Sequence, residues 1–392
     1  MKWKTRKTTR RSFVAAALLM ACAAPQIPAA AAAATPQQAP GQQPGQLPAR
    51  TKAGAPAEVP APTGKEPVGT KTLRLVDDSR NDPWKPAAGK RELMVTLWYP
   101  ARHRGERDAP YMSKALSKAW LGQEDLAGVR TNATTGARPA PGARPLVVLS
   151  PGFGMPRETL TGLGEDLASR GYAVAAVDHT YEAPVEFPGG RIETCEICEK
   201  RDLSDVVTNR AADFRFVLDR LTGPGSPLAV DARRIAVVGH SVGGASAVRA
   251  LQDDPRVDAA VNLDGNFPQK LTAPVNKPVM LVGAQRAGNA EHMEDWDKAW
   301  GHLTGWKRWF DVPEGGHMTF TDAPWLVDSF GLPGQMPPGD VKKAYGSLHG
   351  TRSTALTRAY VGAFLDRHLR GTPGPLLDRP SAAYPEVGLL RK

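Results

Sequence analysis

The stretch Gly239–Gly243, Gly-His-Ser-Val-Gly, has the residue types of an acyl-transfer nucleophile. It matches the G-x-S-x-G pattern, in which a serine lies on a sharp turn between a strand and a helix and exposes its hydroxyl. Small neighbours are needed because the strand and the helix almost touch there. The apolar run Ile235–Gly239 precedes the motif, and a helical pattern that ends before Pro255 follows it. The sequence therefore predicts that Ser241 is a nucleophile.

The general base for such a serine is a histidine placed after a late strand of the sheet. The chain has 8 histidines. His317 lies in the glycine-rich stretch Pro313–Met318, directly after the predicted strand Lys307–Val312. His240 adjoins the serine and is expected to point away from it, whereas His179 ends a strand and could line the site without acting as the base. We therefore predict that His317 is the base.

The third member of the predicted site is a carboxylate that orients the histidine and stabilises its protonated form. Asp264 ends the run Val257–Asp264, a predicted strand that follows the nucleophile's strand. The next run, Val279–Ala284, is followed by no carboxylate until Glu291. Asp264 is the predicted acid, and Glu291 is the alternative.

Two backbone N–H groups are expected to stabilise the negative charge that develops on the substrate oxygen. One belongs to Val242, the residue after the nucleophile. The other is assigned to Phe153, in the stretch Pro151–Gly154 after the apolar run Leu146–Ser150, because the flanking glycines let its amide turn towards the site. The alternative is that Pro151–Gly154 forms an ordinary turn.

Short apolar runs alternate with segments of helical periodicity from residue 68 onward, which is typical of a mostly parallel sheet with flanking helices. The central runs are apolar throughout, as expected for strands covered on both faces. The sequence thus predicts an α/β fold with an eight-stranded sheet. The predicted strands are Lys71–Val76, Leu93–Tyr99, Leu146–Ser150, Tyr172–Asp178, Ile235–Gly239, Val257–Asp264, Val279–Ala284 and Lys307–Val312.

Residues 1–34 have the pattern of an export signal. A start rich in lysine and arginine is followed by the apolar run Phe13–Ala24, which is too short to span a bilayer stably. The pair Arg10 and Arg11 resembles a twin-arginine signal. An ordinary secretory signal that contains two arginines is the alternative. We expect an exported protein in either case.

The end of this signal leaves two outcomes open. Leu19–Cys22 resembles a lipobox, in which Cys22 would be acylated and anchor the protein to a membrane. The small residues of Ala29–Ala34 offer cleavage sites for ordinary signal peptidase instead. The expected location is therefore outside the cytoplasm, either secreted or lipid-anchored at the cell surface.

Residues 35–67 are rich in proline, glutamine, alanine and glycine, and this composition predicts a disordered linker. Residues 68–392 show no internal repeat and are predicted to form a single catalytic domain. Most of the formal net charge of +10 comes from residues 1–67. Because the predicted domain has no cluster of basic residues, a nucleic-acid partner is excluded.

The chain has 3 cysteines, and two of them, Cys195 and Cys198, form a C-x-x-C pair in the predicted domain. There is no second pair that would complete a zinc site. An exported protein is exposed to oxidising conditions. We predict a local disulfide, with two free thiols as the alternative.

Several stretches between residues 146 and 268 together resemble the plasma-type platelet-activating factor acetylhydrolases. They read LVVLSPGFG, DLASRGYAVAAVDH, RIAVVGHSVGGA and NLDGNFP, and weaker similarity extends to VTLWYP and GGHMTFTD. The family's nucleophile, acid and base carry over to Ser241, Asp264 and His317. Its oxyanion position carries over to Phe153.

This resemblance implies an α/β-hydrolase fold and a serine esterase that removes short or oxidised acyl chains from phospholipids without calcium. It implies no metal and no organic cofactor. The sequence departs from the family at Glu182–Lys200, which has no counterpart, and at Pro151, where the family often has histidine. Both departures bear on the choice of substrate and not on the type of reaction.

The expected partner is an ester or phospholipid substrate, with contact to a lipid surface as a further expectation and a monomer as the expected state. Phe320 and Trp325, near the predicted base, are candidates for the acyl pocket, although core positions are the alternative for both. A second interpretation is a lipase-like hydrolase of polyesters, triglycerides or small esters. A third is a binding protein that has the hydrolase fold and no activity.

Overall fold

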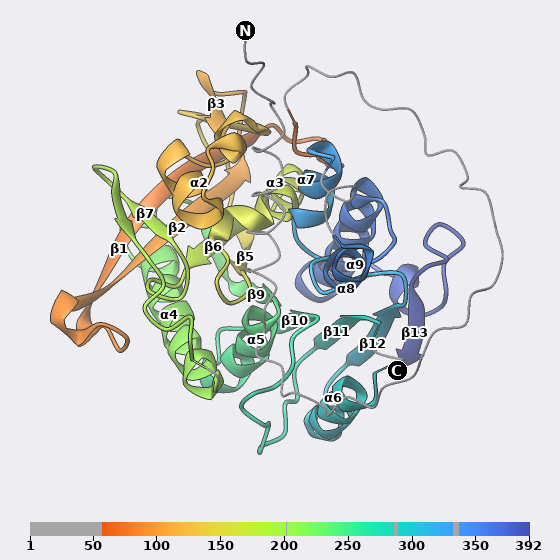
Figure 1. Ribbon diagram of the computed structural model, residues 1–392. Coiled ribbons are helices and arrows are strands. Elements are labelled where there is room, and N and C mark those ends of the chain that lie inside the picture. Colours follow the sequence, from red (N-terminus) through yellow and green to blue (C-terminus); the bar gives the residue numbers. More distant parts are fainter. Residues whose placement is uncertain (1–56, 201, 286–288, 332–336) are drawn as a thin grey trace, which may run out of the picture.

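The computed structural model describes residues 57–392, with gaps at residues 201, 286–288 and 332–336 (Figure 1). The predicted export signal with Cys22, and residues 35–56 of the predicted linker, lie outside the described residues. Within the described part, the chain forms a large mixed sheet and a separate two-stranded ribbon.

The large sheet has eleven strands in the order β13-β12-β11-β10-β9-β5-β6-β2-β1-β4-β3. Its central strands, from β6 through β5, β9, β10 and β11 to β12, all run parallel to their neighbours. In the sheet are β1 (Val68–Asn81), β2 (Lys90–Pro100), β3 (Arg107–Pro110), β4 (Arg130–Thr135), β5 (Arg144–Ser150), β6 (Ala173–Asp178), β9 (Val230–His240), β10 (Ala259–Leu263), β11 (Val279–Ala284), β12 (Lys307–Val312) and β13 (Gly388–Arg391). The ribbon consists of β7 (Val185–Phe187) and β8 (Arg191–Glu193).

All eight predicted strands are present, so the predicted α/β class is confirmed, but the predicted number of strands is wrong. The additional strands of the sheet are β3, β4 and β13. Their sequences, RDAP, RTNATT and GLLR, are short, and those of β3 and β4 have no apolar run. They lie at or near the two edges of the sheet, where burial on both faces is not required and periodicity gives no signal.

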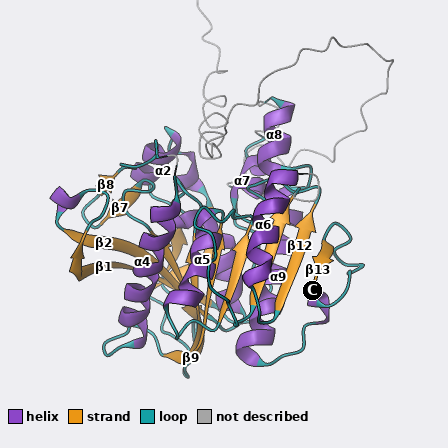
Figure 2. Ribbon diagram, turned by 90° about the horizontal axis from the view of Figure 1, so that it is seen from below, coloured by secondary structure: helices purple, strands orange, loops and turns teal. Residues whose placement is uncertain are grey.

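Helices cover both faces of the sheet, with α4, α5 and α6 on one side and α3, α7 and α9 on the other (Figure 1). In Figure 2, α4 and α5 lie along the strands that they cover. The apolar stripe of α4, from Val207 to Leu221, is buried against the sheet. The helices are α2 (Lys114–Leu121), α3 (Thr161–Ser169), α4 (Ser204–Thr222), α5 (Val242–Asp253), α6 (Ala290–His302), α7 (Ala323–Ser329), α8 (Pro338–Tyr345) and α9 (Gly350–Arg370), with short 3-10 helices at Pro86–Ala88, Asp125–Gly128, Arg157–Leu160 and Pro375–Leu377.

Residues 57–67, which the composition assigned to the linker, instead pack on the domain. Val59 is 1% exposed, and its N–H donates to the carbonyl of Arg130 at 2.9 Å. The buried guanidinium of Arg358 donates to the carbonyls of Pro60 and Ala61, both at 2.8 Å. A buried apolar side chain and backbone hydrogen bonds offset the ordering entropy of a segment whose composition alone predicts disorder.

The predicted disulfide between Cys195 and Cys198 is present, in the segment that connects β6 to α4. Within this segment, the N–H of Glu196 donates to the carbonyl of Tyr181 at 2.9 Å. Lys85 also contacts the Glu196 carboxylate at 2.7 Å. The segment that has no counterpart in the resembling family is therefore an ordered part of the domain.

Candidate active site

Ser241 lies between the end of β9 and the start of α5, in a backbone conformation with φ 55° and ψ −129°. Such a conformation costs free energy for a residue other than glycine, and it is kept only where the surroundings enforce it. Here the Ser241 N–H donates to the carbonyl of Leu263 at 2.8 Å. A Cβ atom at Gly239 would collide with the backbone of Gly243, so the strand and the helix approach as the motif requires.

The structure brings Ser241, His317 and Asp264 together in one chain of hydrogen bonds. His317 Nε2 lies 3.1 Å from Ser241 Oγ, and His317 Nδ1 lies 2.7 Å from Asp264 Oδ2. A carboxylate at Nδ1 selects the tautomer with hydrogen on Nδ1, which leaves the Nε2 lone pair for the serine hydroxyl. This arrangement can remove a proton from Ser241 Oγ and hold the resulting imidazolium.

Asp264 directly follows β10, which lies between the nucleophile's strand β9 and β11. Its N–H donates to the carbonyl of Val282 at 2.8 Å, and its Oδ1 accepts from the Ala284 N–H at 3.0 Å. One carboxylate oxygen is therefore fixed by β11 while the other contacts His317. The alternative acid, Glu291, lies exposed in the first turn of α6 and is not part of this chain of hydrogen bonds.

The loop that carries His317 is fixed by backbone contacts to α8. The Met318 N–H donates to the carbonyl of Ala344 at 2.8 Å, and a Cβ at Gly316 would collide with the backbone around Ala344. His240 supports the same loop, because its Nε2 lies 2.7 Å from the carbonyl oxygen of His317 and donates to it. Burial, together with the nearby His317, lowers the pKa of His240 to about 3, so His240 is neutral. Sequence reasoning placed His240 away from the serine and missed this support.

The two amides assigned to the oxyanion site lie on segments that approach each other. Val242 is the first residue of α5, and an N–H at that position has no acceptor within the helix. Pro151–Gly154, which we call the oxyanion loop, runs beside the start of α5. A Cβ at Gly243 would collide with the carbonyl oxygen of Ser150 and lie 2.7 Å from that of Pro151. The start of the oxyanion loop, two residues before Phe153, therefore lies beside the N-terminus of the helix that Ser241 precedes.

The structure does not place Phe320 and Trp325 in an open acyl pocket. Both side chains are 1% exposed. Phe320 packs in the core with residues of α9, and the Trp325 ring lies edge-on to Tyr111 at 6.1 Å between ring centroids. The aromatic residue type did not indicate which side of the segment faces the core. The prediction that Phe320 and Trp325 line an acyl pocket is therefore wrong for both residues.

Two other aromatic side chains lie half-buried at the oxyanion loop, namely Phe153 itself and Trp120 of α2. Trp120 Nε1 donates to the carbonyl of Gly154 at 3.1 Å. Its ring packs against an apolar cluster that includes Met155 and Met318, which follow the oxyanion loop and the histidine. Sequence reasoning missed Trp120, since no motif or spacing connects residue 120 to the site.

A solved structure from Streptomyces cinnamoneus, named a ferulic acid esterase, matches this fold with a TM-score of 0.84. The two sequences are 66% identical, and the match covers 86% of this chain and 100% of that chain. The chain belongs to this esterase family. This similarity shows that the chain has the α/β-hydrolase fold and is a carboxylic ester hydrolase.

Further matches connect the esterase to the family that its sequence resembles. Residues 58–185 match the model of platelet-activating factor acetylhydrolase, isoform II, and residues 133–323 match the PET hydrolase-like model. The "Probable 1-alkyl-2-acetylglycerophosphocholine esterase" of Arthroderma benhamiae is 26% identical over 85% of this chain and 93% of its own length. A bis(hydroxyethyl) terephthalate hydrolase of Streptomyces coelicolor is 29% identical over 35% of this chain and 38% of its own length. The predicted relationship to the acetylhydrolases is confirmed.

Proposed function

We propose that this chain is an exported hydrolase of small, dispersed carboxylic esters that uses Ser241, His317 and Asp264 through an acyl-enzyme. The observation that supports this most strongly is the continuous chain of hydrogen bonds from Asp264 through His317 to Ser241, at 2.7 and 3.1 Å. Export is inferred from the pattern of residues 1–34 alone.

In the first step of the proposed reaction, Ser241 Oγ attacks the ester carbonyl carbon while its proton passes to His317 Nε2. The amides of Val242 and Phe153 donate to the oxygen that becomes negative. When the carbon–oxygen bond to the alcohol breaks, His317 returns the proton to the leaving oxygen. Water then attacks the acyl-enzyme with the same proton transfers, which releases the acid and restores Ser241.

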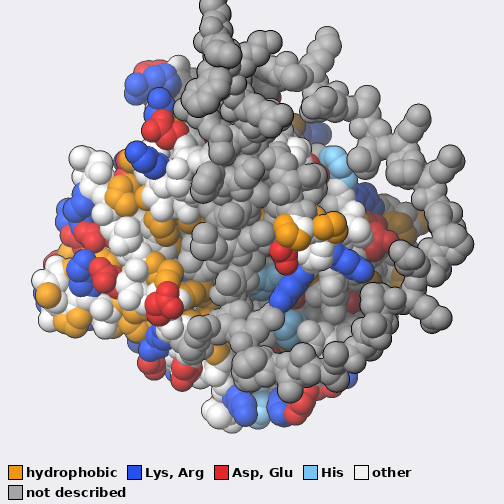
Figure 3. All heavy atoms as spheres, viewed as in Figure 1, with side chains coloured by type: hydrophobic (Ala, Val, Ile, Leu, Met, Phe, Trp, Pro, Cys, Tyr) orange, Lys and Arg blue, Asp and Glu red, His pale blue; other side chains and the backbone are white. Residues whose placement is uncertain are grey.

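The surface of the domain favours substrates that are dispersed in water. Leu390, at 39% exposure, is the one large apolar side chain exposed among the described residues, and apolar side chains in Figure 3 are scattered among polar and charged ones. Proteins that dock on lipid usually present a contiguous apolar patch. No described helix has the length and hydropathy that a membrane span requires.

An aromatic acyl group is the substrate feature that we propose. The 66% identity to a protein named a ferulic acid esterase supports this choice. The half-buried rings of Phe153 and Trp120 at the oxyanion loop also support it, because aromatic rings pack favourably against one another. A short-chain acyl phospholipid is the second candidate. It is favoured by the match of residues 58–185 to the acetylhydrolase model and by the relative that this chain matches over 93% of its length.

A substrate panel separates these candidates. We expect kcat/KM for methyl ferulate and for p-nitrophenyl acetate or butyrate to exceed that for p-nitrophenyl laurate by about tenfold or more, since pocket contacts discriminate by such factors. An acetylated phospholipid should react more slowly than methyl ferulate. A faster phospholipid would favour the second candidate, and a maximum at twelve carbons or more would contradict the small-ester proposal in favour of a lipase-like enzyme. The Ser241→Ala variant, assayed on the same panel, is the control for contaminating esterases.

A further inference from the structure

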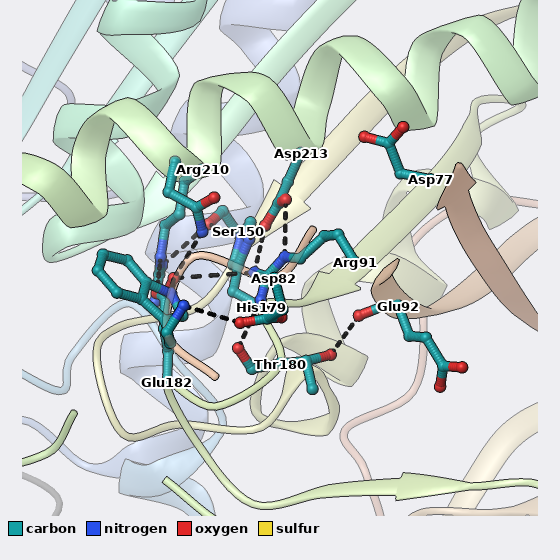
Figure 4. A network of polar contacts seen from close by, with 12 residues as sticks. Asp77, Asp82, Arg91, Glu92, Ser150, His179, Thr180, Glu182, Arg210 and Asp213 are labelled. Atoms are coloured by element: carbon teal, nitrogen blue, oxygen red, sulfur yellow. Dashed lines mark hydrogen bonds and ion pairs between the residues drawn. The ribbon is translucent and has the colours of Figure 1, made fainter. Parts of the chain in front are cut away.

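A network of buried charged side chains lies beside the oxyanion loop, and no step of the proposed reaction uses it. Figure 4 shows Arg210 and Asp213 reaching from α4 towards Ser150, His179 and Glu182. The side chains of Arg210 and Glu182 are each 1% exposed, and Arg210 Nε donates to Glu182 Oε2 at 2.7 Å. A buried ion pair does not by itself stabilise a fold, because desolvation of both charges can exceed their attraction.

The two members of this ion pair hold the two ends of the oxyanion loop. Arg210 Nη1 donates to the carbonyl of Pro151 at 2.5 Å, at the start of the loop. The backbone carbonyl of Glu182 accepts the N–H of Gly154 at 3.0 Å, at the end of the loop. The peptide group before Gly152 is therefore hydrogen-bonded to Arg210, and the peptide group after Phe153 is hydrogen-bonded to Glu182.

A second set of contacts fixes the orientation of Arg210 itself. Its Nη1 also donates to Ser150 Oγ at 3.1 Å, and Ser150 Oγ lies 3.0 Å from His179 Nε2. His179 Nδ1 lies 2.8 Å from Asp213 Oδ2, and Asp213 also accepts from Arg91 Nη2 at 2.7 Å. Every one of these atoms belongs to a buried side chain, so each hydrogen bond constrains the next.

The protonation states agree with this direction of hydrogen bonding. Burial, together with the nearby Arg210, lowers the pKa of His179, so its ring is neutral. Although burial alone would raise the pKa of Asp213, Arg91 and the hydrogen bond from His179 hold it well below its usual range. With the His179 proton on Nδ1, its Nε2 accepts the Ser150 hydroxyl, whose oxygen accepts from Arg210.

Ser150, His179 and Asp213 have the same residue types and the same order of contacts as the triad, but their geometry excludes nucleophilic chemistry. Ser150 is 0% exposed and its hydroxyl is already hydrogen-bonded to both Arg210 and His179. An ester carbonyl cannot reach a buried hydroxyl. The structural function of this chain of contacts is to hold Arg210.

We propose that the Arg210–Glu182 ion pair positions the Phe153 amide for oxyanion stabilisation, an inference that rests on the proposed function. Oxyanion donors are effective because they are held in place before the charge develops and need no reorganisation. Neither Arg210 nor Glu182 contacts the triad in the structure, so both are positioning residues. The ion pair fixes two peptide groups that a glycine-containing loop would otherwise leave adjustable.

Arg210→Lys tests this positioning. Lysine keeps the charge, but a single ammonium cannot reproduce the planar fork that contacts Pro151, Ser150 and Glu182 together. We expect kcat per titrated active site to fall by about 10- to 100-fold, as for small displacements of catalytic groups, with KM changed by less than about threefold. The inhibition constant of a trifluoromethyl ketone, whose tetrahedral adduct places an oxyanion in the site, should rise by the same factor as kcat/KM falls.

Glu182→Gln carries the test if Arg210→Lys does not fold, because it keeps the shape and removes the ion pair. The same changes in kcat and in the inhibition constant are expected. Arg358→Lys is the matched control, since Arg358 is 4% exposed and donates to carbonyls away from the oxyanion loop. It should lower the melting temperature without changing kcat per titrated site.

The proposal is overturned if the wild-type protein is active and Arg210→Lys and Glu182→Gln both retain its kcat per titrated site within about twofold. An unchanged inhibition constant for the trifluoromethyl ketone would overturn it as well. A wild-type protein that hydrolyses no ester would instead contradict the proposed function, so the two failures are distinguishable.

Discussion

Replacement of Ser241 by alanine is expected to lower ester turnover by about 10⁶-fold, the loss measured for the nucleophile of a related triad. Alanine has no oxygen with which to form the acyl-enzyme. The hydroxyl contacts His317 at the surface of the site and no core residue, so the melting temperature should stay near that of the wild type. Initial rates with p-nitrophenyl acetate and a thermal melt measure both quantities.

Ser353→Ala is the matched control for this variant. Ser353 is a buried serine of α9 whose hydroxyl has no hydrogen-bond partner among the described residues. Its replacement should leave turnover within about twofold of the wild type, since Ser353 lies in α9, which carries no residue of the triad. Turnover of Ser241→Ala within tenfold of the wild type would contradict its assignment as the nucleophile.

Asp264→Asn is expected to lower turnover by about 10⁴-fold, the effect of the equivalent change in a serine protease. With its oxygen held by the Ala284 N–H, the asparagine presents its NH2 group to His317 Nδ1. Because this group donates, the tautomer with hydrogen on Nε2 is favoured, and Nε2 no longer accepts from Ser241. The contact from the Ala284 N–H to the side-chain oxygen can persist in the variant. The melting temperature should therefore change little, and kcat with p-nitrophenyl acetate is the measurement.

Glu291→Gln is the control for the acid, because Glu291 is the alternative that the sequence left open. Its side chain is exposed on α6, so turnover should remain within about twofold of the wild type. An inactive Glu291→Gln together with an active Asp264→Asn would move the acid to the segment after β11. It would also contradict the hydrogen-bond chain described above.

The residues of the triad could be predicted because each follows a strand of the parallel sheet that the sequence predicts. Carboxyl ends of parallel strands meet at one edge, so Ser241 after β9, Asp264 after β10 and His317 after β12 are brought close by the topology alone. The central strands β5, β6, β9 and β11 could be predicted from their apolar runs. The edge strand β4 could not be predicted in this way, because RTNATT has no apolar periodicity.

Other features depend on packing that no local pattern encodes. Trp120 reaches the oxyanion loop through a single hydrogen bond to Gly154, 34 residues further along the chain. Arg210 and Glu182 are 28 residues apart and lie in different segments. Phe320 had the residue type expected of a pocket, but its side chain faces the core. Sequence spacing predicts contacts within an element, whereas these contacts depend on how elements meet.

Labelling with a fluorophosphonate, followed by mass spectrometry of peptides, tests the central claim most directly. The reagent forms a covalent bond with a serine that a histidine activates. We expect one adduct per molecule, on Ser241, and none in the Ser241→Ala variant, while buried Ser150 stays unlabelled in both. An adduct on another serine, or no adduct on the folded wild-type protein, would contradict the claim that Ser241 is the nucleophile.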